Sequence, residues 1–257
     1  MNGEMYQIAS IVAAAKMAIK TNKEIKFTPT QYENSIKFEF LPKKIAFTTK
    51  KYTASNVSEW FGELKKKGLQ DIKLLCPYAV KDRYLLGFSN TTESLILCFF
   101  KNAKVTYFVA DWKFDSTQKK WNILYSEYEW ENAPSEKPHF ENNIDSFRKV
   151  LSDIQKLAFQ IECENFANVF GLALQILNDE NKDFDKTEGL ELLQLPSQNL
   201  KIFTAANRAD VFGAMGSWND SPPYMAHEKG LDKEYETLSS ELLKNIRLAI
   251  LYSVNEW

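Results

Sequence analysis

The chain has 257 residues, of which 44% are hydrophobic and 26% charged, and its formal net charge is −2 with a pI near 5.9. These values are typical of a globular protein with one large domain or two small ones, and they exclude collagen-like and low-complexity chains. A dedicated nucleic-acid binder would carry a basic excess over the whole domain, so we expect no nucleic-acid partner.

No apolar run approaches the roughly 20 residues that cross a membrane. The first ten residues also lack the basic and apolar regions of a secretory signal. We therefore expect a cytoplasmic protein with no membrane contact.

Charge is distributed unevenly along the chain. Residues 1–133 carry 20 Lys and Arg against 14 Asp and Glu, whereas residues 134–257 carry 12 against 20. Two interpretations stay open. In the first, the two halves attract each other or disperse their charges over solvated faces. In the second, an acidic helical face binds a basic partner, or a basic patch binds an acidic one.

Three cysteines, Cys76, Cys98 and Cys163, are widely spaced and odd in number. Cys76 and Cys98 lie in apolar runs, which is typical of buried free thiols in a reducing compartment. No Cys or His pairing has the spacing of a zinc site. We expect neither a metal nor another cofactor.

The first half predicts helices beside a sheet. Apolar residues three and four apart over 4–20 indicate one amphipathic helix, and alternation over 36–40 indicates a strand. Asn56 with Glu59 three positions later has the arrangement of a capping box, and Gly68 would end that second helix. Further strands are expected at 45–47, 72–80, 83–89, 94–100, 104–113 and 121–130.

Short connections between these strands predict an antiparallel meander. A polar linker, 131–139, separates it from a helical second half. There we expect helices at 140–161, 166–177 and from Asp232 onward, a short helix at 188–195, a strand or buried connector at 200–206, and a break near Glu162–Asn165. The predicted fold is α+β: a single integrated domain, 1–257, whose helix-rich part (134–257) packs on its sheet-rich part (1–133).

The sequence contains no GxSxG, P-loop or GxGxxG motif, and His227-Glu228 is not part of an HExxH motif. We therefore predict no catalytic residues and expect a non-catalytic protein that binds another protein. The alternative is a hydrolase or transferase with an unfamiliar site, in which Asp220 works with His227 as a base.

The most irregular stretch is 207–230, which holds three of the nine glycines and two adjacent prolines. A structural interpretation makes Trp218 a plug between the sheet and the helices. A functional interpretation makes the stretch a binding loop on a rigid scaffold. The predicted binding residues are Trp218, Asn219, Asp220, Tyr224 and His227.

Within this stretch, residues 212–220 (FGAMGSWND) resemble a Gly-Met-Gly-Ser-aromatic-Asn-Asp segment of uncharacterised bacterial proteins. Some of those proteins resemble immunity or accessory proteins of toxin systems. Ala214 stands where that segment has a second Gly, and the resemblance carries over no catalytic residue. It implies a bacterial protein whose partner would be a toxin.

Overall fold

The computed structural model describes residues 2–45, 48–178 and 192–257. The chain divides into two compact units. The helical unit comprises Met1–Tyr6, Cys76–Thr92 and His139–Trp257, and the sheet unit comprises Gln7–Leu75 and Glu93–Pro138. Helix α1 (Gly3–Thr21) begins in the helical unit and continues in the sheet unit. No helix of the described residues is both long enough and apolar enough to cross a membrane.

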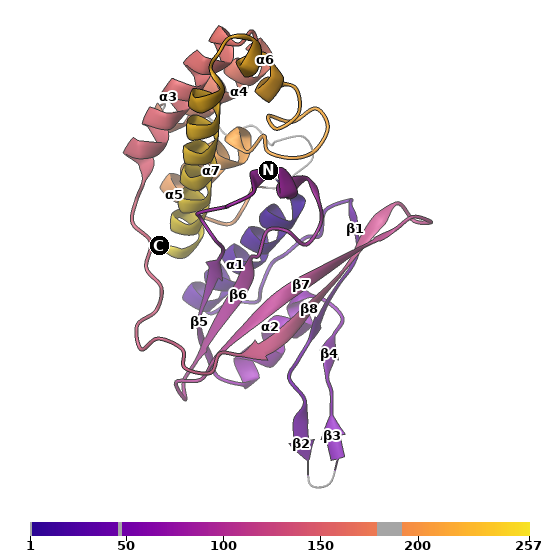
Figure 1. Ribbon diagram of the computed structural model, residues 1–257. Helices are drawn as coiled ribbons and strands as arrows, with labels where there is room; N and C mark the ends of the chain where they lie inside the picture. The colour runs from indigo at the N-terminus through magenta and orange to yellow at the C-terminus, as the bar shows by residue number, and fades with distance from the viewer. Residues whose placement is uncertain (1, 46–47, 179–191) are drawn as a thin grey trace. The chain divides into compact units, whose positions relative to one another are not determined.

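The sheet unit is built on six strands in the order β4-β1-β8-β7-β6-β5 (Figure 1). Their bounds are β1 Glu33–Glu39, β4 Thr53–Ala54, β5 Leu69–Leu75, β6 Leu95–Phe100, β7 Val105–Asp115 and β8 Lys120–Glu129. Strands β5 to β8 form the predicted antiparallel meander. A separate two-stranded ribbon is formed by β2 (Lys43–Ile45) and β3 (Thr48–Lys50).

The prediction of a purely antiparallel sheet is wrong at β1. This strand pairs parallel with β8, with Ile36 opposite Ile123, and antiparallel with the two-residue strand β4. Because β1 and β8 are far apart in the sequence, no short connection dictated their direction, and the sheet is mixed.

Helices α1 and α2 (Val57–Lys66) cover one face of the sheet. On that face Trp60 stacks on Phe38 with ring centroids 4.6 Å apart, and Tyr125 stacks on Phe38 at 4.9 Å. Tyr125 also donates its hydroxyl to Gln7 of α1 at 2.8 Å. All four side chains are buried, so this face is the core of the sheet unit.

The predicted start and end of α2 are confirmed. The Asn56 side chain accepts the Glu59 N–H at 2.9 Å, and the Glu59 carboxylate accepts the Ser55 N–H at 2.8 Å. Gly68 follows the helix with a φ of +86°, a conformation that costs other residues more than glycine.

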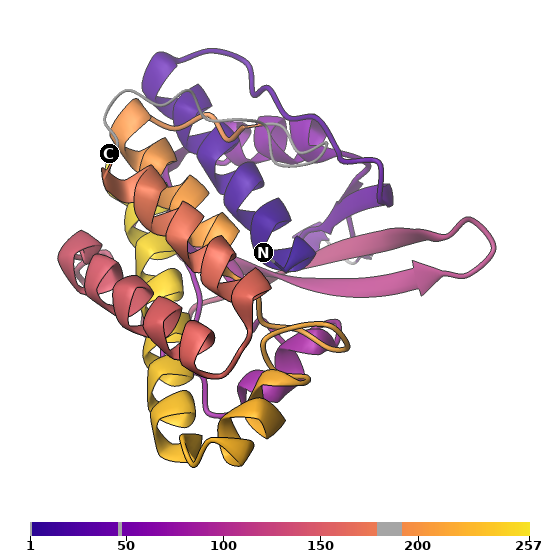
Figure 2. The same cartoon turned by 90° about the horizontal axis from the view of Figure 1, so that it is seen from above.

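The helical unit contains α3 (Ile144–Gln160), α4 (Glu164–Asn178), α5 (Ser197–Ala209), α6 (Pro222–Glu228) and α7 (Asp232–Asn255). Figure 2 shows α3, α4, α5 and α7 side by side, and α7 packs against α3, α5 and α6. The apolar stripe of α3 is therefore buried within the chain. The predicted break between α3 and α4 is confirmed at Glu162, whose φ is +59°.

Several element predictions for this unit are wrong. Residues 83–89 form a short 3₁₀ helix, η1 (Arg83–Gly87), and not a strand, because Asp82 caps the N–H of Tyr84 at 3.0 Å. Residues 200–206 belong to helix α5, in which seven consecutive residues from Lys201 to Asn207 are buried, so no amphipathic period was visible.

Two further expectations concern helix ends. Asp232 is the first residue of α7, and Leu231 occupies the cap position without a side-chain hydrogen bond. Residues 188–191 of the predicted helix 188–195 lie outside the described part of the chain, and residues 192–195 form no helix. Residues 46–47 of the strand predicted at 45–47 also lie outside the described part.

Candidate functional site

Trp218 is a core residue of the helical unit, with none of its surface exposed. Its ring lies 5.2 Å from both Phe166 and Phe170 of α4 and 5.4 Å from Tyr235 of α7. Its indole N–H donates to the buried Ser239 hydroxyl at 2.7 Å. The Tyr235 hydroxyl donates to the Trp218 carbonyl. Trp218 therefore plugs a gap between helices, and the partners that we had expected from the sheet come from α4 and α7.

Asn219 joins the loop after α5 to η1. Its side-chain amide donates to the Arg83 carbonyl at 3.0 Å. The two segments also meet at Gly87, where a Cβ atom would lie 2.7 Å from the Ala214 backbone nitrogen. Such a distance is shorter than real Cβ contacts, so only glycine lets the segments approach this closely.

The junction of these two segments presents large apolar side chains to solvent. Tyr84, Leu85 and Phe88 of the η1 segment are 43%, 50% and 64% exposed, and Met215 of the loop is 93% exposed. We call these four residues the apolar patch. Four exposed large apolar side chains on two joined, irregular segments are a feature of binding surfaces.

Three acidic groups lie near the apolar patch. Asp82 precedes η1, and Asp220 follows the loop, where its carboxylate accepts the Gly216 N–H at 2.7 Å. The Glu236 carboxylate binds both terminal nitrogens of the buried Arg83 at 2.6 and 2.8 Å. The hydrogen bond from Arg83 lowers the pKa of Glu236, which keeps this carboxylate ionised near neutral pH.

The remaining predicted site residues lie on α6. Tyr224 is 63% exposed, and the exposed His227 ring meets the Asp232 carboxylate at 2.9 Å. His227 and Asp220 therefore have different hydrogen-bond partners, and the structure shows no bond between them of the kind that a base and its orienting carboxylate would make. Of the five predicted residues, the structure places Trp218 and Asn219 in the scaffold and Asp220 beside the patch.

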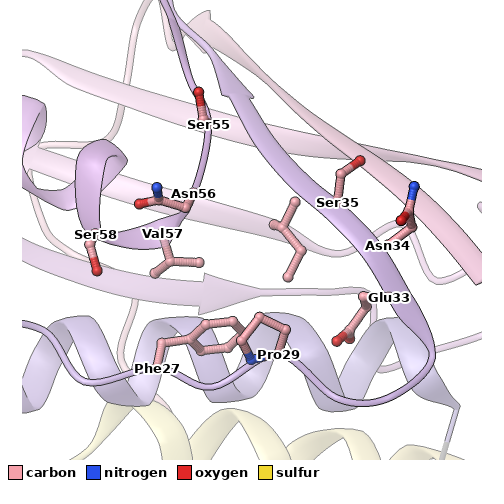
Figure 3. Close-up of a pocket in the computed structure, with 10 residues that line it drawn as sticks. Phe27, Pro29, Glu33, Asn34, Ser35, Ser55, Asn56, Val57 and Ser58 are labelled. Carbon is pink, nitrogen blue, oxygen red and sulfur yellow. The ribbon is translucent and has the colours of Figure 1, made fainter.

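Three pockets in the described part of the chain contain neither Asp220 nor His227. One, of about 250 Å³, lies in the sheet unit between β1 and the start of α2 (Figure 3). Three of its polar side chains make hydrogen bonds within the protein. Asn34 and Ser35 donate to Asn122 at 2.9 and 2.8 Å, and Asn56 caps α2. This recess presents no paired acid and base.

Sequence reasoning missed the η1 half of the patch, because the run RYLLGF was read as a strand. A usable signal was present: Asp82 and Gly87 bracket the run, and its apolar residues are adjacent and not alternating. The closeness of η1 to the loop, more than 120 positions later in the sequence, had no local signal.

No group of three or more His, Cys, Asp or Glu side chains among the described residues is arranged to hold a metal ion. The three cysteines are free thiols, two of them buried. No protein-family model, curated protein or solved structure matches the chain.

Proposed function

We propose that this protein binds another protein through the apolar patch, and that it acts as a non-catalytic binding protein of the bacterial cytoplasm that neutralises a toxin. The observation that carries the proposal is the patch itself. Met215 and Phe88 expose most of their side chains, although the segments that hold them are fixed by buried contacts. A rigid frame with exposed apolar anchors is how a protein limits the entropy cost of binding.

The charge of the helical unit supports a basic partner. The unit contains 21 acidic and 13 basic residues, a net charge of −8. Asp82, Asp220 and Glu236 lie close to the patch, whereas the buried Arg83 is already paired. An acidic rim around an apolar centre accelerates association with a positively charged surface and discriminates against acidic ones.

The toxin-neutralising role rests on the resemblance of residues 212–220 to a segment of immunity-like proteins. Part of that segment now has a structural explanation, since Trp218 and Asn219 hold the loop in place. Met215, at the centre of the same segment, is the most exposed large apolar residue of the described chain. Such a division between buried frame and exposed anchor is what a partner-binding loop requires.

The experiment is a quantitative pull-down from a lysate of the native cells. The patch variant Phe88→Ala/Met215→Ala is compared with Phe159→Ala/Leu172→Ala, whose residues lie in the same unit and are 51% and 43% exposed. Loss of two anchors at above 1 kcal/mol each should lower capture of the bound protein by at least about tenfold.

The control variant should capture the protein as the wild type does, and both variants should keep the wild-type melting temperature. The gene beside this one should encode the captured protein, and that protein should carry a basic surface. Equal capture by the patch variant, or no partner at all, would refute the proposal.

A further inference from the structure

The recess between β1 and the start of α2 carries a single formal charge. It lies wholly within the sheet unit and has a volume of about 250 Å³ (Figure 3). Among the described residues that line it, five are Asn or Ser, and Glu33 alone is charged. A hollow whose one formal charge is negative favours a cation over an anion.

The Glu33 carboxylate is held in place without being neutralised. One of its oxygens accepts the Gln7 side-chain amide at 2.9 Å, and the other accepts the Thr30 N–H. No Lys, Arg or His of the described residues forms an ion pair with it. Each carboxylate oxygen can accept two hydrogen bonds, so both keep acceptor capacity. A fixed anionic group with spare acceptor capacity is a suitable partner for an ammonium group.

The side chains that follow Glu33 also present acceptors. The Asn34 amide nitrogen and the Ser35 hydroxyl donate to the Asn122 side-chain oxygen at 2.9 and 2.8 Å. Each thereby directs a donor to Asn122 and keeps its own oxygen as an acceptor. Figure 3 shows Glu33, Asn34 and Ser35 together along β1, on the side of the recess away from Ser58. A ligand that meets this side gains most as a hydrogen-bond donor.

The edge of β1 adds a backbone acceptor. The Phe40 N–H donates to the Tyr52 carbonyl at 2.9 Å, and hydrogen-bonded positions alternate along an antiparallel pair. Phe38, which lies opposite Ala54, therefore also directs its N–H and C=O toward β4, and so does Ile36. Strand β4 ends at Ala54, so no residue of β4 lies opposite Ile36, which lines the recess. The Ile36 carbonyl is thus available to a ligand.

The other lining residues of the recess are apolar. Ile36 and Val57 are almost wholly buried, and Phe27 and Pro29 belong to the segment that connects α1 to β1. Such walls match a ligand with an apolar body and one polar end. Drug-sized ligands occupy pockets of roughly 300–1,000 Å³, so this recess suits a smaller molecule.

We propose that the recess binds a small organic amine, with its ammonium group at Glu33 and its apolar body against Phe27, Pro29 and Val57. An ammonium group has three donors and no acceptor, which matches the carboxylate and the adjacent oxygens of β1. The site lies in the sheet unit and shares no residue with the apolar patch, so it does not rest on the proposed function.

The test titrates the full chain with three probes of similar shape, 2-phenylethylamine, 2-phenylethanol and 3-phenylpropionate, which are cationic, neutral and anionic. Binding is followed by the NMR chemical shifts of the backbone amides. The amine should bind with a dissociation constant on the order of 1 mM and shift the amides of Ile36 and Val57. The alcohol and the carboxylate should bind at least about tenfold more weakly, because neither offers a cation to Glu33.

Glu33→Gln should weaken amine binding at least about tenfold, since it removes the charge and keeps the shape of the side chain. The matched control is Glu24→Gln, which removes the same charge from an exposed residue of the same unit that does not line the recess. This control should bind the amine as the wild type does.

Melting temperatures check that both variants fold, and the comparison of the three probes on the wild type needs no variant. Three results would overturn the proposal. These are no shift of the Ile36 and Val57 amides with about 10 mM amine, equal binding of the amine and the alcohol, or unchanged amine binding by folded Glu33→Gln. None of them bears on the capture of a protein by the apolar patch.

Discussion

Replacement of Trp218 by alanine tests whether the irregular loop is held by packing. The side chain is wholly buried against Phe166, Phe170 and Tyr235. Its removal leaves a cavity between α4 and α7. It also leaves the buried Ser239 hydroxyl without the indole N–H that donates to it in the wild type. We expect a large loss of stability in the helical unit.

The size of the loss follows from two contributions. A buried tryptophan removes roughly 150–250 Å² from water, and Trp→Ala substitutions in cores cost about 3–5 kcal/mol. The lost hydrogen bond adds about 1 kcal/mol, the usual net contribution of an intramolecular hydrogen bond. The sum of about 4–6 kcal/mol approaches the total stability of many domains, which is about 5–15 kcal/mol.

Urea unfolding monitored by the circular dichroism signal of the helices measures this loss. Tryptophan fluorescence is less suitable, because five other tryptophans contribute to it. Ser239→Ala is the matched control: it keeps the ring packing, leaves the indole N–H without its partner, and should cost only about 1–3 kcal/mol. Met215→Ala, at a 93% exposed residue of the same loop, should cost almost nothing. A Trp218→Ala variant within 1 kcal/mol of the wild type would refute the reasoning.

Three further predictions concern single side chains. Glu236→Gln should lower stability near neutral pH by about 1 kcal/mol, since half of the Glu236 side chain is exposed. The difference should disappear in pH-dependent melts as the pH falls below the lowered pKa of Glu236, because protonation removes the same charge from the wild type. Asn56→Ala should cost about 1 kcal/mol by removing the α2 cap, measured by urea unfolding, whereas Asn34→Ala should not. Burial raises the pKa of all three thiols, but Cys163 is only half buried. Iodoacetamide should therefore label Cys163 well before Cys76 and Cys98 in the native protein, as followed by mass spectrometry. Simultaneous labelling of the three thiols would contradict the burial.

Elements with one buried face were predictable from the sequence. The α2 cap, the β5–β8 meander and the α3–α4 break each have a local cause that lies in neighbouring residues. Helix α5 was not predictable, because it is buried on nearly all sides and has no hydrophobic period to distinguish it from a strand. The parallel β1–β8 pairing depends on residues nearly 90 positions apart, which no local pattern encodes.

The sequence indicated the loop around Trp218, and the structure explains why its residue types are unusual. The sequence did not indicate the Gly87–Ala214 contact, because the need for glycine at position 87 arises from a distant segment and not from a turn. Exposure of Met215 could not be predicted either, since methionine is as common in cores as on binding surfaces.

The division of the helical unit into three stretches of chain has a consequence during synthesis on the ribosome. Once residue 138 has emerged, every residue of the sheet unit is available, whereas Cys76–Thr92 must wait for partners from His139–Trp257. Gly87 meets Ala214 only after the loop that follows α5 has been made. Trp218 is enclosed only when α7 emerges. The loop that carries Met215 therefore acquires its full packing late in translation, because Tyr235 and Ser239 of α7 contact Trp218.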